Sequence, residues 1–193
     1  MKVSREQAAE NRERIIDVAG KLFRERGFDG IGVADLMKAA GLTHGGFYGH
    51  FKSKDDLIAQ ASARANAGTC KTWSATVDRL GEGAFAALAG QYLSTAHRDN
   101  PGMGCAFAAL GSEVGRQGEA VRGVFSEGLE GLIDILAGTL PGGSAAEKRR
   151  KALAAMAEMV GALALARAVG DDALSKEILA AAREDLGIEA AFP

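Results

Sequence analysis

Residues 41–57 read GLTHGGFYGHFKSKDDL, and this stretch decides the fold. Three glycines, Gly45, Gly46 and Gly49, stand among aromatic residues between flanks that have a helical pattern. A glycine in a helix interior costs about 1 kcal/mol relative to alanine. A glycine-rich helix therefore needs a compensating reason, and one such reason is the close approach of another molecule to a backbone that lacks Cβ atoms.

The sequence before this stretch predicts two helices. Ser4 and Gln7 have the spacing of a capping box, and apolar residues then recur at helical intervals as far as Gly27, a typical C-terminal glycine. A second helix is expected over residues 33–40, and Gly41 ends it. Both helices are short enough to belong to a small helical domain.

The stretch itself predicts a third helix over residues 44–50, capped by Thr43. Ser53 and Asp56 then form another capping box, which opens a fourth helix. Only residues 41–43 connect the second and third helices. A tight three-residue turn that contains a glycine is typical of a helix-turn-helix.

The rest of the chain is expected to be helical as well, so the predicted fold class is all-α. Only three prolines occur among 193 residues, and no alternating Val/Ile/Thr run is long enough for a sheet strand. We expect a helix-turn-helix domain at residues 1–53 and a larger helical domain at residues 54–193. The apolar pattern after residue 53 predicts helices at 54–79, 83–98, 105–116, 119–139, 145–169 and 172–186.

Composition and motifs argue against several classes of function. The net charge of −2 gives no overall attraction to nucleic acid or anionic lipid. The polar N-terminus is not a signal peptide, and the apolar run at residues 152–166 is too short to span a membrane. Cys70 and Cys105 have no disulfide-framework spacing, so we expect a cytoplasmic protein. No phosphate loop, nucleophile elbow or catalytic constellation occurs, so we expect neither an enzyme nor a cofactor.

The N-terminal end of the 44–50 helix carries the candidate DNA-binding residues. Recognition helices place their N-terminal residues at base edges in the major groove, and the free N–H groups of a helix start favour a phosphate. Gly45 and Gly46 remove Cβ atoms at this end. Phe47 and Phe51 share a face and are expected to anchor the helix in the core. Hydrogen-bond donors surround the same end: Thr43, His44, Tyr48, His50 and Lys54.

With this spacing, residues 31–57 resemble the DNA-binding domain of the TetR family of transcriptional repressors. Residues 40–57 match every fixed position of the pattern A-G-hydrophobic-[ST]-x-G-x-hydrophobic-Y-x-H-F-x-x-K-x-x-L. Gly49 stands where family members commonly have a larger residue, which limits direct base readout, and Gly32 stands where the second helix usually opens with a phosphate-binding Thr or Ser. The resemblance implies phosphate contacts by Thr43, Tyr48, His50 and Lys54, and places His44, Gly45 and Gly46 at the bases, with Gly49 completing the set.

The resemblance also implies a function and its partners. A ligand-responsive transcriptional regulator is expected, most simply a repressor that a small apolar effector releases from a palindromic, inverted-repeat operator in double-stranded DNA. A homodimer is implied, in which helices 145–169 and 172–186 form a four-helix bundle with those of a second subunit. The segments THGGFYGHF and PGMGCAFAALGSEV together are similar to the subgroup with an LmrA/YxaF-type C-terminal domain. Residues expected to line the effector cavity are Trp73, Phe85, Tyr92, Cys105, Phe107, Phe125, Met156 and Met159.

Other interpretations of the same residues stay open. An effector-independent DNA-binding protein and a helical small-molecule carrier with a vestigial DNA-binding domain both fit the pattern. A metal site at His44 and His50 is disfavoured, because residues six apart lie about 240° round a helix and do not converge. Cys70 and Cys105 would act as oxidant sensors only if exposed, and a buried apolar role suits both better. The charged run at residues 147–151 is expected to be a solvated first turn or a dimer edge.

Overall fold

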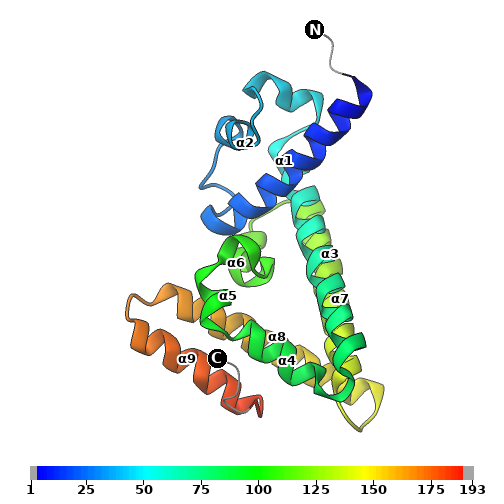
Figure 1. The fold of residues 1–193 in the computed structure, drawn as a ribbon, viewed down its shortest axis with the longest axis vertical. Helices are drawn as coiled ribbons and strands as arrows, with labels where there is room; N and C mark the ends of the chain where they lie inside the picture. Colours follow the sequence, from blue (N-terminus) through cyan, green and yellow to red (C-terminus); the bar gives the residue numbers. More distant parts are fainter. Residues whose placement is uncertain (1–3, 189–193) are drawn as a thin grey trace.

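A computed structural model describes residues 4–188, and every regular element in this part of the chain is helical. The prediction of an all-α fold is confirmed. The first three residues of the predicted 1–53 domain and the last five of the predicted 54–193 domain lie outside the described residues. The molecule is elongated, with α1 and α2 at one end and α4, α8 and α9 at the other (Figure 1).

The N-terminal end begins with two helices whose limits agree with the sequence pattern. α1 (Arg5–Arg26) starts after Ser4, whose side-chain oxygen accepts the Gln7 backbone N–H, and ends at Gly27 with φ +79°. α2 (Val33–Ala39) ends in a turn where Gly41 has φ +72°. Gly41 N–H and Leu42 N–H donate to the carbonyl groups of Lys38 and Met37, which is a Schellman motif. A residue with a side chain would be strained at Gly41, so this glycine sets the helix-turn-helix turn.

The third helix differs from its prediction in kind. Residues His44–Gly49 form a 3-10 helix, η1, rather than an α-helix, and the Thr43 side chain makes no capping hydrogen bond. Thr43 thus occupies the predicted N-cap position, but it does not cap the helix through its side chain. Three glycines within six residues remove the side-chain packing and propensity that hold an α-helix together, and a short tight helix is what remains.

A first hydrophobic core joins these three elements to the beginning of the next. Phe23 of α1, Leu36 of α2 and Phe47 of η1 are all buried in it. It also takes in Leu110 and Phe125 from later helices, so apolar packing continues across the predicted boundary between residues 53 and 54. The division of the chain at that boundary stays a prediction.

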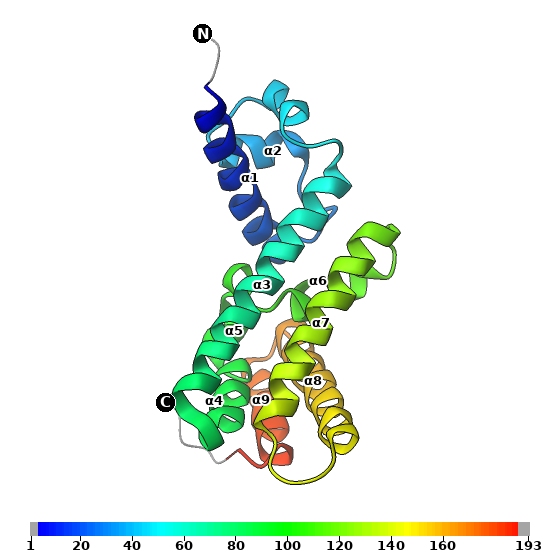
Figure 2. The same ribbon diagram turned by 90° about the vertical axis from the view of Figure 1, so that its right-hand side faces the viewer.

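Two long helices run from beside the N-terminal helices to the far end of the molecule (Figure 2). α3 (Lys54–Leu80) and α7 (Glu119–Thr139) pack against each other (Figure 2). Between them the chain forms η2 (Gly81–Gly83), α4 (Ala84–Tyr92), α5 (Thr95–Asp99), η3 (Pro101–Met103) and α6 (Ala106–Val114).

The predicted single helix at 83–98 is wrong, because α4 and α5 are separate helices. The chain leaves the helical conformation at Leu93 and is extended at Ser94. The Ser94 side chain then accepts the His97 backbone N–H at 3.1 Å and donates to the Gln91 carbonyl at 2.7 Å. Serine favours such local bonds over helix continuation, so it ends one helix and caps the next.

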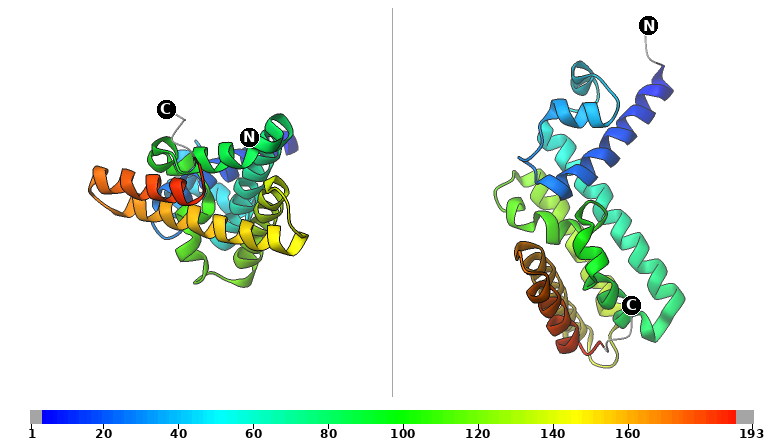
Figure 3. Two further views of the ribbon diagram at one scale, coloured as in Figure 1. Left: turned by 90° about the horizontal axis from the view of Figure 1, so that it is seen from below. Right: turned by 60° about the vertical axis from the view of Figure 1, so that its left-hand side comes forward.

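The C-terminal helices complete a second hydrophobic core. α8 (Ala145–Ala168) and α9 (Asp172–Asp185) lie antiparallel and side by side at the end far from α2 (Figure 3). Ser144 and Glu147 form the full capping box that the sequence predicts for α8. Leu153, Leu165 and Leu174 on these two helices are exposed despite their size. No helix among residues 4–188 is long and apolar enough to cross a membrane.

Candidate nucleic-acid interface and ligand cavity

The predicted DNA-binding residues lie on one surface of η1 and the adjoining helix start. Phe47 is fully buried beneath this surface, with its ring centroid 5.6 Å from that of Phe51. Tyr48 stacks edge-on against Phe47 and is 71% exposed. Thr43, His44, Gly45 and Gly49 are also exposed, whereas Gly46, His50 and Lys54 are half-buried.

The glycines of η1 are not required by the fold itself. None of the three has a positive φ. A Cβ added at Gly45 or Gly49 would meet no atom within 4 Å, and one at Gly46 would lie 3.6 Å from the Met37 methyl group, an ordinary contact. Internal packing therefore leaves room for side chains here. The bare backbone is open on its outer side, where a partner molecule can approach it closely.

The start of α3 presents a cation and free helix N–H groups on the same surface. Ser53 accepts the Asp56 backbone N–H at 3.1 Å, and the Asp56 carboxylate accepts the Lys52 N–H at 2.9 Å. The hydrogen bond from Lys52 lowers the pKa of the Asp56 carboxyl group, and a second hydrogen bond, from the Gln60 side chain, lowers it further. The Lys54 ammonium forms no ion pair with the carboxylates of the described chain. A cation at a helix N-terminus beside open backbone suits a phosphate.

A cavity of about 520 Å³ lies beside the middle of α3, where Arg64 and Trp73 are among its lining residues. Of the residues predicted for an effector site, Trp73, Tyr92 and Cys105 line it. The other five lie elsewhere: Phe107 and Phe125 stack on each other with centroids 5.2 Å apart, and Phe85, Met156 and Met159 pack in the second core. The structure adds lining residues that the sequence reasoning did not find, among them Arg24, Arg64, Gln91, His97 and Asn100.

His97 occupies the cavity wall as a neutral imidazole. The Cys105 backbone N–H donates to Nε2 at 3.0 Å, so Nε2 carries no proton and Nδ1 donates to the Tyr92 carbonyl at 2.8 Å. Burial lowers the pKa of His97, and the nearby Arg167 adds to this effect. A ring held by two backbone groups fixes the connection between α4 and η3.

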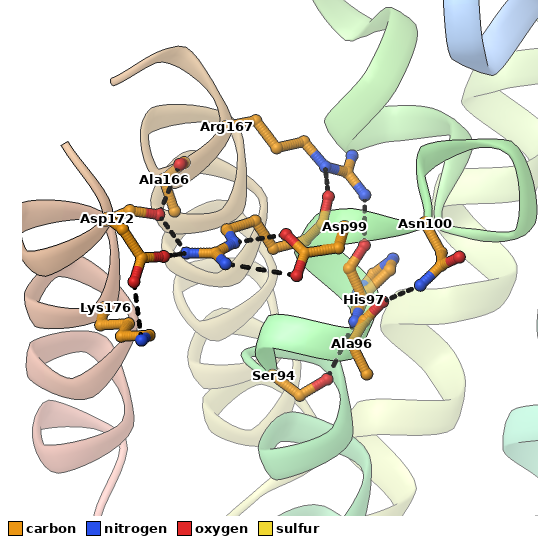
Figure 4. A network of polar contacts seen from close by, with 11 residues as sticks. Ser94, Ala96, His97, Asp99, Asn100, Ala166, Arg167, Asp172 and Lys176 are labelled. Atoms are coloured by element: carbon orange, nitrogen blue, oxygen red, sulfur yellow. Dashed lines mark hydrogen bonds and ion pairs between the residues drawn. The ribbon is translucent and has the colours of Figure 1, made fainter. Parts of the chain in front are cut away.

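A polar network fastens this wall to the C-terminal helices (Figure 4). Arg167 of α8 donates to the carbonyls of His97 and Arg98, at 2.7 and 3.0 Å. Arg98 in turn bonds Asp172 and Ser175 of α9, both at 2.9 Å. The cavity wall formed by α5 is thereby linked to α8 and α9.

Two polar atoms near the cavity have no partner among the described residues: the Tyr92 hydroxyl and Arg167 Nη1. Tyr92 is only 4% exposed and lies edge-on to Trp73 and His97, with centroid separations of 6.1 and 4.7 Å. Burial raises the pKa of Tyr92 well above its ordinary value, so the hydroxyl keeps its proton. Its neighbour Cys105 offers only a weakly accepting sulfur, so the hydroxyl lacks a strong acceptor.

The described residues include no group of three or more His, Cys, Asp or Glu side chains placed to hold a metal ion. His44 and His50 therefore belong to no such group among these residues. Cys105 is buried and Cys70 is half-buried, and burial raises the pKa of both thiols.

Comparison with known proteins agrees with this geometry. Residues 15–61 match the model of bacterial regulatory proteins of the tetR family. The HTH-type transcriptional regulator AcrR of Shigella flexneri is 40% identical over 57 residues, which are 30% of this chain and 26% of that regulator. The sequence match thus spans only about a quarter of that relative's length.

Solved structures match over a much larger part of the chain. The reduced form of NemR from E. coli superposes with a TM-score of 0.77 at 23% identity, over 92% of this chain and 96% of that one. A TetR-family transcriptional regulator from Agrobacterium tumefaciens gives the same TM-score at 22% identity, over 92% and 98%. Residues 15–61 are therefore similar to the N-terminal domain of the tetR family of bacterial regulatory proteins, and the chain has the fold of solved TetR-family regulators.

Proposed function

We propose that this protein is a DNA-binding transcriptional regulator, and specifically a repressor that leaves an inverted-repeat operator when a small molecule enters the cavity. The observation that carries the DNA half of the proposal is the open glycine backbone of η1 beside the exposed Tyr48 and the unpaired Lys54. Bare backbone, a protruding phenol and a helix-start cation together fit a phosphate-lined groove.

The roles follow from position on that surface. Thr43, Tyr48, His50 and Lys54 surround the ends of η1 and contact phosphates. His44, Gly45 and Gly46 form its first turn and face base edges, so direct readout depends mainly on His44 and on backbone groups. Because Gly45 and Gly46 have no side chains with which to contact bases, the protein also recognises the shape of the DNA.

A homodimer built by α8 and α9 completes the proposal. Leu153, Leu165 and Leu174 leave apolar surface on these helices that a second copy would cover. A twofold dimer carries two η1 surfaces, so its operator is an inverted repeat. Cytoplasmic location, the division at residues 53 and 54, and an LmrA/YxaF-type C-terminal domain belong to the same proposal.

The effector half rests on the cavity among α1, α3, α4, α5 and η3. Its volume is in the range of small-molecule sites. α3 lines it through Trp73 and also begins at Lys54, so a displacement of the helix at one end moves the other.

Selection of bound sequences from random double-stranded DNA tests the proposal. We expect enrichment of an inverted repeat, and loss of enrichment with His44→Ala. Lys71→Ala is the matched control, because Lys71 is exposed on α3 far from η1. Failure to enrich any sequence, or enrichment of a single half-site only, would contradict the repressor-dimer proposal.

A further inference from the structure

Arg24 and Arg64 are the charged side chains in the cavity lining, because His97 is a neutral imidazole. None of the described residues that line the cavity is an aspartate or glutamate. The remaining lining is apolar or neutral, and its large apolar side chains are those of Trp73, Leu88 and Met103. A site of this composition accepts an apolar body and favours a negative charge.

The two arginines differ in how far their charge is already compensated. Arg64 bonds the carboxylates of Glu13 and Asp17, the latter at 2.9 Å. The Arg24 guanidinium instead donates to the Gly102 carbonyl, through Nε at 3.0 Å and through Nη2, and it forms no ion pair within residues 4–188. Its neighbour Glu25 pairs with Lys21 at 3.8 Å.

Arg24 is thus a partly buried cation without a carboxylate partner. Burial lowers its pKa, which reflects the free-energy cost of keeping this charge out of water. Part of that cost is recovered when an anion pairs with the guanidinium, because charge-assisted hydrogen bonds are about twice as strong as neutral ones. The orphaned Tyr92 hydroxyl, buried in the same lining, offers a further donor to such a ligand.

We propose that the effector is a small organic anion, an aromatic or aliphatic carboxylate, whose charged group pairs with Arg24 and whose apolar body packs on Trp73. This inference rests on the proposed function of the cavity as the effector site. A carboxylate can accept two parallel hydrogen bonds from the planar guanidinium, as a phosphate ester also can, and the carboxylate is the smaller, planar group of the two.

Arg24 also gives this ligand a way to act on the DNA-binding end. It belongs to α1, whereas Gly102 belongs to η3, so their hydrogen bond ties the first helix to the cavity wall. A carboxylate competes with the Gly102 carbonyl for the same guanidinium. α1 shares the first core with Phe47 of η1, so a change at Arg24 reaches the recognition surface through packed side chains.

Calorimetric titration without DNA tests the ligand class on the intact protein. The probes are naphthalene-2-carboxylate and octanoate, each compared with its primary amide. We expect the wild type to bind at least one acid about tenfold or more tightly than its amide. Equal affinity for acid and amide in both pairs, or no binding of either acid, overturns the inference.

Substitutions then locate the charge that is responsible. Arg24→Gln should abolish the preference for the acid and leave amide affinity within about twofold, and Arg24→Lys should restore part of the preference. Arg26→Gln is the matched control, since Arg26 is exposed on the same helical turn and does not line the cavity. Arg64→Gln should have a smaller effect, because Glu13 and Asp17 already pair with Arg64. Retention of the full preference in Arg24→Gln overturns the assignment.

A second arm separates this inference from the proposed function. The same acids are added to the protein bound to its selected operator, and the wild type but not Arg24→Gln should release DNA. If acids bind in an Arg24-dependent way and DNA stays bound, the proposed switch fails while the ligand class stands.

Discussion

Lys54→Ala should lower the salt dependence of DNA binding by an amount that the structure fixes. Lys54 begins α3 beside the η1 surface and has no ion-pair partner within the described residues, so in the proposed complex its ammonium neutralises one phosphate per subunit. Each neutralised phosphate contributes about −0.9 to the slope of log K against log salt. A dimer that loses two such contacts should therefore show a slope smaller in magnitude by about 1.8.

The same reasoning gives the loss of affinity. At about 0.1 M salt, each phosphate contact contributes about 0.9 log units relative to 1 M salt, so a variant dimer that loses two contacts should bind operator roughly 60-fold more weakly. The weakening should be equal for operator and non-specific DNA, because phosphate contacts carry no base information. At higher salt the difference between wild type and variant should shrink.

Fluorescence anisotropy with labelled operator, over a series of salt concentrations, measures both quantities. Lys71→Ala provides the control, since it removes the same charge from the same helix at a distance from η1. If Lys54→Ala leaves the slope unchanged, or if Lys71→Ala lowers it equally, Lys54 does not contact phosphate. A slope that falls without any loss of specificity ratio is the expected signature.

Three further predictions concern the recognition surface, the dimer and the cavity wall. Tyr48→Phe removes only the hydroxyl of an exposed ring, so operator and non-specific affinities should fall together by about 1 to 2 kcal/mol in a filter-binding assay, and a loss confined to the operator would assign Tyr48 to base readout instead. Leu165→Arg replaces a leucine that is 59% exposed on α8 with a charged residue, so light scattering should report a monomer and DNA affinity should drop. The control Leu80→Arg, at the end of α3, should remain a dimer. His97→Gln should flatten the pH dependence of unfolding. The pKa of His97 is lowered in the folded protein, so the unfolded chain binds a proton first as pH falls below about 6.5. The free energy of unfolding of the wild type should therefore decline below that pH by at most about 1.4 kcal/mol per pH unit more than that of the variant. Chemical denaturation measures the free energy of unfolding of both proteins between pH 7 and pH 5, and an equal decline in the two would refute the His97 assignment.

The parts of the fold that were predictable from sequence are those set by neighbouring residues. Ser4, Ser53 and Ser144 each accept the backbone N–H three residues later, so spacing alone locates three helix starts. Gly27 and Gly41 end helices for an equally local reason, their positive φ. The break between α4 and α5 also depends on local hydrogen bonds of Ser94. The helical spacing of apolar residues continues past Ser94, however, so that spacing predicts one uninterrupted helix.

The two candidate sites differ in the same way. The η1 surface is one continuous stretch, so residue types and spacing describe it almost completely. The cavity joins Arg24 to a carbonyl 78 residues away, and no periodicity relates them. Aromatic composition also does not say which rings leave space: Phe107 and Phe125 fill the volume between their helices by stacking on each other. The effector-binding set therefore stays a prediction that the cavity lining refines.

α1 and α3 both line the cavity and both extend to the η1 end of the molecule, and the geometry of α3 shows how little movement the proposed switch would require. Trp73 and Lys54 are separated along this helix by about 28 Å at 1.5 Å per residue. A tilt of about 5° about the Trp73 end displaces Lys54 by about 2.5 Å. Hydrogen bonds to phosphate fail beyond about 3.5 Å, so this tilt is enough to break the contact. α1 is tied to the cavity through Arg24 and to η1 through the first core. In the proposed switch, a ligand that pairs with Arg24 should therefore move α1 and α3 together, whereas a neutral ligand should press on α3 alone.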